Sequence, residues 1–139
     1  MKNLIIAICT LFMINVSSAQ NWKKENLMPP AELAEKLQSS SADKPIVFNV
    51  GPMENIKSAR YVGKGTSITT ISKMKSELSM ESKNKTVVIY CGCCSFSNCP
   101  NIKPAFDELV KAGFKNTKVL EIPEGIKPDW VAKGYPMEE

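Results

Sequence analysis

The sequence contains no histidine. This excludes Cys–His and Ser–His nucleophile pairs, histidine metal ligands and acid–base catalysis by imidazole. If the protein carries out chemistry, cysteine, lysine, carboxylate, tyrosine or backbone dipoles must supply it.

The chain also lacks a strong excess of one charge. Its 18 basic and 14 acidic residues give a net charge of +4, and the basic residues are scattered. No basic stripe with interleaved aromatic residues is present, so we expect no nucleic-acid partner. The 139 residues contain no internal repeat or low-complexity tract, which predicts one domain with one core.

The N-terminus has no apolar run long enough for a comfortable membrane span. Lys2 is followed by an apolar run from Leu4 to Val16 and by small residues before Gln20. This pattern predicts a signal peptide over residues 1–19, and hence an exported, periplasmic or secreted protein without membrane attachment after cleavage. An uncleaved N-terminal anchor is the alternative.

The cysteines are unevenly placed. Of the five, Cys9 lies in the predicted signal peptide, and the other four lie between Cys91 and Cys99. Such closely spaced cysteines cannot join distant segments, because the loops they would close are small and constrain little chain entropy. Their spacing therefore favours local chemistry or local rigidity of one loop.

Short apolar runs alternate with helical patterns after a polar leader at residues 20–27. Strands are expected at 45–50, 86–90 and 118–122, and the stretch 53–67 is expected to be irregular. Helices are expected from Pro29 with Leu33, Ala34 and Leu37 inward, over 68–80 with Ile71, Met74 and Leu78 inward, over 104–113 with Phe106, Leu109 and Val110 inward, and over 128–133. Met74 and Met80 are interpreted as core residues.

This alternation predicts an α/β fold, with a mostly parallel sheet covered by helices on both faces. Ligands of such sheets bind at the carboxyl ends of the strands. Cys91 directly follows the predicted central strand and precedes a loop and a helix. Loop N–H groups and the positive end of the helix dipole would stabilise a thiolate there.

The order of these pieces resembles the rhodanese family, over about residues 28–137. The resemblance rests on strand ends at Asn49-Val50 and Val87-Val88-Ile89-Tyr90-Cys91, the helix end Leu109 with Ala112-Gly113-Phe114, and then Val119-Leu120, Gly125-Ile126, Trp130 and Gly134-Tyr135-Pro136. It implies a sulfurtransferase or sulfur carrier, in which Cys91 would take a sulfane sulfur as a persulfide. The partners would be a small sulfur donor and a thiol or cyanide-like acceptor, and no cofactor is implied.

The chain departs from the family pattern at three places. Asn49-Val50-Gly51 stands where members commonly carry Asp-x-Arg. The loop after Cys91 is longer than usual and has no basic residue before Lys103, and it holds extra cysteines. We assign loop and anion-stabilising roles to Gly92, Ser95, Phe96, Ser97, Asn98, Asn101 and Lys103. Of these, Asn101 is most simply a helix N-cap.

Several uses of the cysteines stay open from sequence. Cys93, Cys94 and Cys99 are candidate resolving or redox thiols, and Cys91 with Cys94 has the spacing of a redox dithiol. Attack by one of them on a Cys91 persulfide would release sulfide and leave a disulfide. Two or three of the four thiolates could instead hold Cu(I) or Zn(II), or disulfides could lock the loop.

Overall fold

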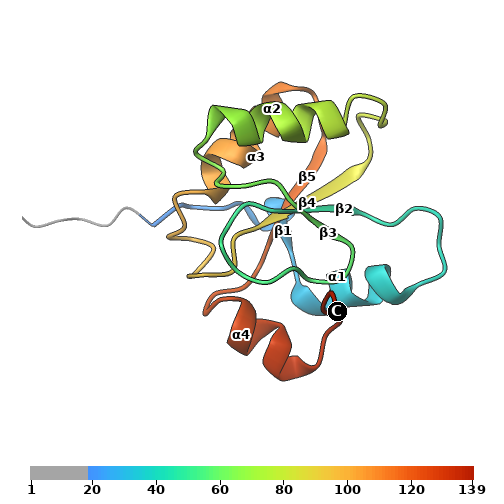
Figure 1. The fold of residues 1–139 in the computed structure, drawn as a ribbon, viewed down its shortest axis with the longest axis vertical. Helices are drawn as coiled ribbons and strands as arrows, with labels where there is room; N and C mark the ends of the chain where they lie inside the picture. The colour runs from blue at the N-terminus through green and yellow to red at the C-terminus, as the bar shows by residue number, and fades with distance from the viewer. Residues whose placement is uncertain (1–18) are drawn as a thin grey trace, which may run out of the picture.

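The computed structural model describes residues 19–139, so that nearly all of the predicted signal peptide, Cys9 included, lies outside the described residues. Within this range the chain forms a parallel sheet of five strands in the order β1-β5-β4-β2-β3 (Figure 1). The strands are β1 (Leu27–Met28), β2 (Ile46–Asn49), β3 (Ala59–Tyr61), β4 (Thr86–Tyr90) and β5 (Asn116–Leu120). The strand that precedes Cys91 is central, as the sequence predicts.

Helices cover both faces of the sheet. The α-helices of the described chain are α1 (Pro30–Gln38), α2 (Ile68–Glu77), α3 (Ile102–Lys111) and α4 (Ile126–Asp129), with short 3₁₀ turns η1 (Lys24–Asn26) and η2 (Val131–Lys133). Figure 1 shows α2 and α3 on one side of the sheet and α1 and α4 on the other. The predicted α/β class, with a parallel sheet covered on both faces, is therefore confirmed.

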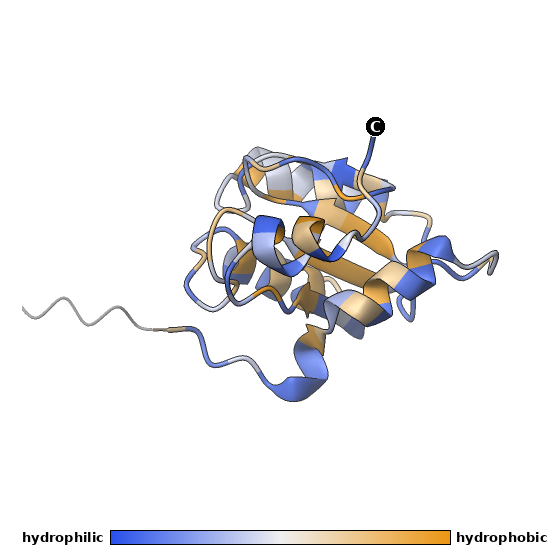
Figure 2. Ribbon diagram, turned by 90° about the horizontal axis from the view of Figure 1, so that it is seen from below, coloured by the Kyte–Doolittle hydropathy of each residue, from blue (hydrophilic) through white to orange (hydrophobic). Residues whose placement is uncertain are grey.

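The alternation of side chains along β4 divides the core into two layers. Val87 and Ile89 pack on the side of α2 and α3, whereas Val88 and Tyr90 pack on the side of α1 and α4. Central strands of a sheet covered on both faces are apolar at nearly every position, in agreement with the hydrophobic strands at the centre of Figure 2. Because successive side chains point to opposite faces, this period places Cys91 in the same layer as α3.

One strand was not predicted. The stretch 53–67 was expected to be irregular, but Ala59–Tyr61 forms β3 and pairs with β2 at the sheet edge. Three residues are too few to show a period of two. Ser58, directly before the strand, has φ 65°, which is not an extended conformation, so the strand does not continue into the preceding residues and stays too short to be predicted.

Two residues predicted as core are exposed. The buried face of α3 is formed by Ile102, Ala105, Phe106 and Leu109, and Val110, one position further round the helix, is 49% exposed. Met80 is 95% exposed, because α2 ends at Glu77 and Met80 lies in the turn beyond it.

The leader, predicted as a loose segment, packs on the domain. The Trp22 ring contacts the Phe106 ring edge-on, with centroids 5.0 Å apart. The last residue of the leader, Leu27, begins β1 and pairs with Val119 of β5. The Gln20 side-chain amide donates to the carbonyl of Cys99 across 3.1 Å. An apolar ring and a short edge strand therefore fix a segment whose composition is polar.

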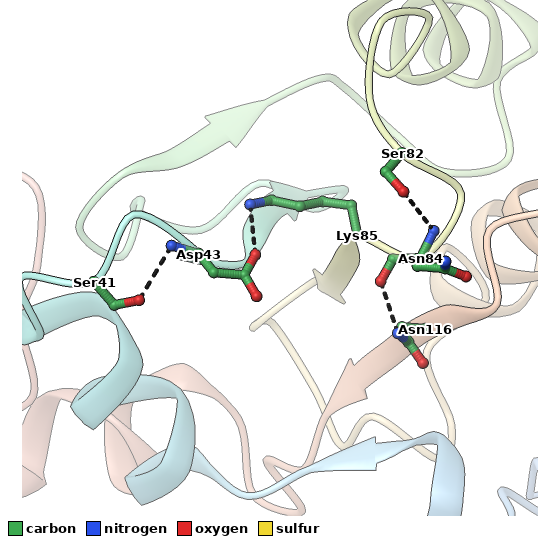
Figure 3. A network of polar contacts seen from close by, with 6 residues as sticks. All are labelled: Ser41, Asp43, Ser82, Asn84, Lys85 and Asn116. Atoms are coloured by element: carbon green, nitrogen blue, oxygen red, sulfur yellow. Dashed lines mark hydrogen bonds and ion pairs between the residues drawn. The ribbon is translucent and has the colours of Figure 1, made fainter.

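Polar contacts tie the connections at the amino ends of the central strands (Figure 3). Lys85 Nζ lies 3.0 Å from Asp43 Oδ1, and Asn116 Nδ2 donates to the carbonyl of Asn84 across 2.7 Å. These residues precede or begin β4, β2 and β5, so they lie at the amino ends of the strands, whereas Cys91 lies at the carboxyl ends. From residue 19 to the C-terminus, no helix has the length and apolar character needed to cross a membrane.

Candidate functional site: the cysteine loop

Cys91 lies at the carboxyl end of the central strand. The neighbouring strand continues beside it, since Val50 N donates to the carbonyl of Tyr90 across 2.8 Å. Residues 92–101 then form the loop, and α3 begins at Ile102. The site therefore lies at the carboxyl ends of the strands, where parallel α/β folds bind ligands, as the sequence predicts.

The loop is fixed to the segment that follows β5. Gly92 has φ 81°, and its carbonyl accepts a hydrogen bond of 2.9 Å from Ile126 N. Phe96 N donates to the carbonyl of Ile122 across 3.3 Å. A Cβ atom on Gly125 would lie 3.0 Å from the Gly92 carbonyl oxygen, so the two backbones are in close contact. The loop conformation is thus set by the rest of the fold.

The Cys91 sulfur accepts several hydrogen bonds. Its Sγ lies 3.3 Å from Cys93 Sγ, and Asn101 Nδ2 donates to it across 3.7 Å. The hydrogen bond from the Cys99 thiol is the largest cause that lowers the pKa of Cys91, to about 5, while burial opposes the shift. Hydrogen bonds from the Cys93 thiol, the Asn101 amide and the Cys93 backbone N–H lower that pKa further. Cys91 is therefore the thiolate of the loop at neutral pH.

The neighbouring thiols keep their protons. Desolvation by the surrounding loop, followed by the hydrogen bond with Cys91, raises the pKa of Cys93 to about 12, although the residue as a whole is exposed. The hydrogen bond to Cys91, followed by burial, raises the pKa of Cys99 above its usual range. One negative charge is thus placed on one sulfur, with protonated thiols around it.

The four thiols differ in exposure. Cys91 and Cys99 are both 0% exposed, whereas Cys93 is exposed and Cys94 half-buried. Cys93 is therefore the exposed thiol that contacts the buried Cys91 sulfur.

The predicted resolving thiols are not equivalent in space. The sulfur atoms of Cys91, Cys93 and Cys99 all lie within 4.8 Å of one another. Cys94 Sγ instead contacts Cys93 Sγ, at 3.6 Å. The loop therefore brings Cys93 next to Cys91, and the redox-dithiol spacing of Cys91 with Cys94 does not correspond to the closest pair.

The other predicted loop residues have different surroundings. Asn101 occupies the N-cap position of α3, but its side chain makes no capping hydrogen bond and donates to Cys91. Lys103 pairs with Asp107 one helical turn further on, at 2.7 Å, rather than with the loop. Ser95 Oγ and Ser97 Oγ lie 2.8 Å apart, and Asn98 N donates to the carbonyl of Ser95. These contacts shape the loop.

Two glycines of the site were not identified from sequence. A Cβ atom on Gly51 would lie 2.4 Å from Cys91 Sγ, and one on Gly65 would lie 1.8 Å from the Asn101 carbonyl oxygen. Both positions therefore require glycine for close backbone approach. Gly51-Pro52 and Gly65 carry a turn signal in the sequence, but the residues they approach are some 40 positions away and only the fold brings them together.

The four cysteines of the described chain are free thiols, so the disulfide-locked loop is not the form seen in this structure. Cys91, Cys93 and Cys99 could hold a soft metal ion. Three sulfur ligands about 2.3 Å from one ion lie about 4 Å from each other, which is compatible with this cluster. Thiolate ligands favour Cu(I) or Zn(II).

No family model matches the chain, and no curated protein matches it. The α/β fold with a parallel sheet, and the cysteine cluster at the end of its central strand, are compatible with a rhodanese-like domain.

Proposed function

We propose that this protein is a sulfurtransferase or sulfane-sulfur carrier of rhodanese type that holds sulfur as a persulfide on Cys91. One observation carries the proposal: at the end of the central strand, the buried Cys91 sulfur accepts from the Asn101 amide, contacts Cys93 Sγ at 3.3 Å and lies within 4.8 Å of the Cys99 sulfur. These donors favour the thiolate, which is the nucleophilic form of cysteine. The family resemblance of the strand and helix order supports the same role.

The reaction has two displacements. The Cys91 thiolate attacks the sulfane sulfur of a donor, the donor's sulfur–sulfur bond breaks, and the leaving group departs with the electron pair. A thiolate or cyanide acceptor then attacks the outer sulfur of the persulfide, and Cys91 leaves as a thiolate. A low pKa makes Cys91 a good leaving group in the second step.

The site favours donors of low charge. The described residues that donate hydrogen bonds to Cys91 do so with thiols, an amide and a backbone N–H, all of which are uncharged. Lys103, the cation predicted to steer an anion, is paired with Asp107. Alkyl persulfides, which carry at most one negative charge on the reacting sulfurs, therefore suit this site better than thiosulfate, whose two charges lie next to the reacting sulfur and need compensation on burial.

In this proposal, the predicted signal peptide directs the protein out of the cytoplasm. Residues 1–19 would be removed and the chain would act in the periplasm or as a secreted protein. N-terminal sequencing of the protein from the extracytoplasmic fraction checks this, with Gln20 as the expected first residue.

Sulfur transfer to cyanide from glutathione persulfide and from thiosulfate tests the function. We expect activity in the wild type, with the persulfide as the better donor. Cys91→Ser should lose at least about a hundredfold, because a serine hydroxyl is not ionised at neutral pH. Cys94→Ser is the matched control and should retain activity. Activity that survives Cys91→Ser would contradict the proposal.

The three-sulfur cluster supports a second candidate, a soft-metal binding module on the same scaffold. The two candidates differ in what the purified protein carries. Native mass spectrometry would show, in the first case, added sulfur on Cys91 or the disulfide that its release leaves, and in the second case a bound metal ion. Cys91→Ser abolishes both, so the mass of the adduct decides between them.

A further inference from the structure

We propose that Cys93 resolves the Cys91 persulfide, so that the protein reduces sulfane sulfur to sulfide and forms a Cys91–Cys93 disulfide. The inference rests on the proposed function, since it begins from the persulfide. It assigns one of the three neighbouring thiols to the step and gives the site a second product, sulfide, when no acceptor arrives.

The distance between the two sulfur atoms carries the inference. Cys93 Sγ lies 3.3 Å from Cys91 Sγ. A disulfide bond is about 2.05 Å long, so the sulfurs need to approach by only about 1.3 Å. Gly92, which lies between them in sequence, has φ 81°, a backbone conformation that residues with a Cβ atom rarely adopt. Glycine at this position therefore permits the tight turn of the Cys-Gly-Cys segment.

Burial distinguishes Cys93 from the other two thiols. Cys99 is 0% exposed, and it donates to Cys91 from within the core, where an external reductant has no access to a disulfide. Cys94 is not part of the group of three mutually close sulfurs. Cys93 is exposed and in contact with Cys91, so its side chain is free to move and its disulfide can be attacked from solvent.

The step balances without an external oxidant. The Cys93 thiol gives its proton to the outer sulfur of the persulfide anion, Cys91–S–S⁻, and the resulting Cys93 thiolate attacks the inner sulfur and forms the new sulfur–sulfur bond. The bond between the inner and outer sulfur breaks, and the outer sulfur leaves with the electron pair as hydrosulfide, HS⁻. A low-molecular-weight thiol or a protein dithiol then restores the site: two thiols are oxidised to one disulfide, and Cys91 and Cys93 are reduced.

The test follows both products after one equivalent of glutathione persulfide is added anaerobically, without other reductant, to the reduced full chain. In the wild type we expect one equivalent of sulfide and a protein mass lower by about 2 Da, with Cys91 and Cys93 protected from alkylation. Cys93→Ser should release sulfide at least about tenfold more slowly and retain a mass gain of about 32 Da on Cys91. Cys94→Ser, a change outside the group of three mutually close sulfurs, should behave as the wild type.

The outcomes separate the two proposals. If Cys93→Ser gains no sulfur at Cys91 although its circular dichroism is native, the proposed function fails. If the wild type keeps the added sulfur and releases no sulfide, or if Cys93→Ser releases sulfide at the wild-type rate, Cys93 is not the resolving thiol and the further inference is overturned. In the second case Cys91 can still be the sulfur carrier.

Discussion

The side-chain amide of Asn101 lies 3.7 Å from the Cys91 sulfur, although Asn101 occupies the N-cap position of α3. A capping asparagine directs its oxygen to the first N–H groups of its helix. Here the nitrogen donates to a thiolate from the loop before the helix. The residue therefore contributes more to the charge state of Cys91 than to the start of α3.

Replacing Asn101 tests this contribution. Asn101→Ala removes one donor to the Cys91 sulfur, so the pKa of Cys91 should rise while helix content stays the same. The ultraviolet absorbance of the thiolate, followed against pH, measures the shift. Asn98→Ala, an exposed change in the same loop, is the control and should leave the titration unchanged. An unchanged titration in Asn101→Ala would show that the amide does not stabilise the thiolate.

The low pKa of Cys91 also predicts a pH dependence of stability. A group whose folded pKa is about 5, against an ordinary value of 9.0, contributes nothing below pH 5 and contributes fully above pH 9. Its contribution therefore grows between these values, by about 1.4 kcal/mol per pH unit at most. Above pH 9 the raised pKa of Cys93, about 12, acts in the opposite direction. Urea unfolding of the reduced protein should show stability rising from pH 5 to 9, and Cys91→Ser should flatten this rise.

Gly51 tests the packing behind the sulfur. Gly51→Ala would place a Cβ atom 2.4 Å from Cys91 Sγ and 2.3 Å from the Cys91 carbonyl oxygen, so the end of β4 must shift. We expect a loss of about 1–3 kcal/mol in unfolding free energy and a higher pKa of Cys91. Gly134→Ala is the comparison, because no atom lies within 4 Å of its added Cβ. It should cost about 1 kcal/mol through its positive φ and leave the thiolate titration unchanged.

Adjacent residues of α3 test which face is buried. Leu109 is 1% exposed and Val110 is 49% exposed. Leu109→Ala should destabilise the fold by about 2–5 kcal/mol through the lost burial and the cavity it leaves. Val110→Ala should change the unfolding free energy by less than about 0.5 kcal/mol. Similar losses in both variants, measured by denaturant unfolding, would place the helix in a different orientation.

Metal binding should compete with sulfur transfer. One Cu(I) ion on Cys91, Cys93 and Cys99 would occupy the thiolate that attacks sulfur. We expect one equivalent of Cu(I) to abolish the uptake of sulfur from glutathione persulfide by Cys91, and a chelator to restore it. Competition with a chromophoric chelator measures the affinity for Cu(I). Cys99→Ser should weaken binding, whereas Cys94→Ser should not. Full transfer activity in the Cu(I)-loaded protein would contradict a shared site.

Much of the fold follows from local sequence. The continuous apolar run before Cys91 predicts a central strand buried on both faces, and the repeat of α3 predicts its buried Phe106 and Leu109. The short edge strand Ala59–Tyr61 was not predicted, because three residues are too few to show the two-residue period of a strand. The packing of Trp22 on Phe106 was not predicted either, because the contact joins segments more than 80 residues apart in sequence.

Local residue patterns establish that this chain is an α/β domain without histidine, and that its described cysteines lie where a central strand meets a loop and a helix. The tertiary structure sets which sulfurs meet, because the loop conformation depends on two hydrogen bonds, from Phe96 N to the carbonyl of Ile122 and from Ile126 N to the carbonyl of Gly92. It placed Cys93, rather than Cys94, against Cys91, turned Asn101 toward the sulfur and brought Gly51 behind it. Spacing along the chain does not specify these contacts, because the distances between side chains depend on backbone angles that the whole fold imposes.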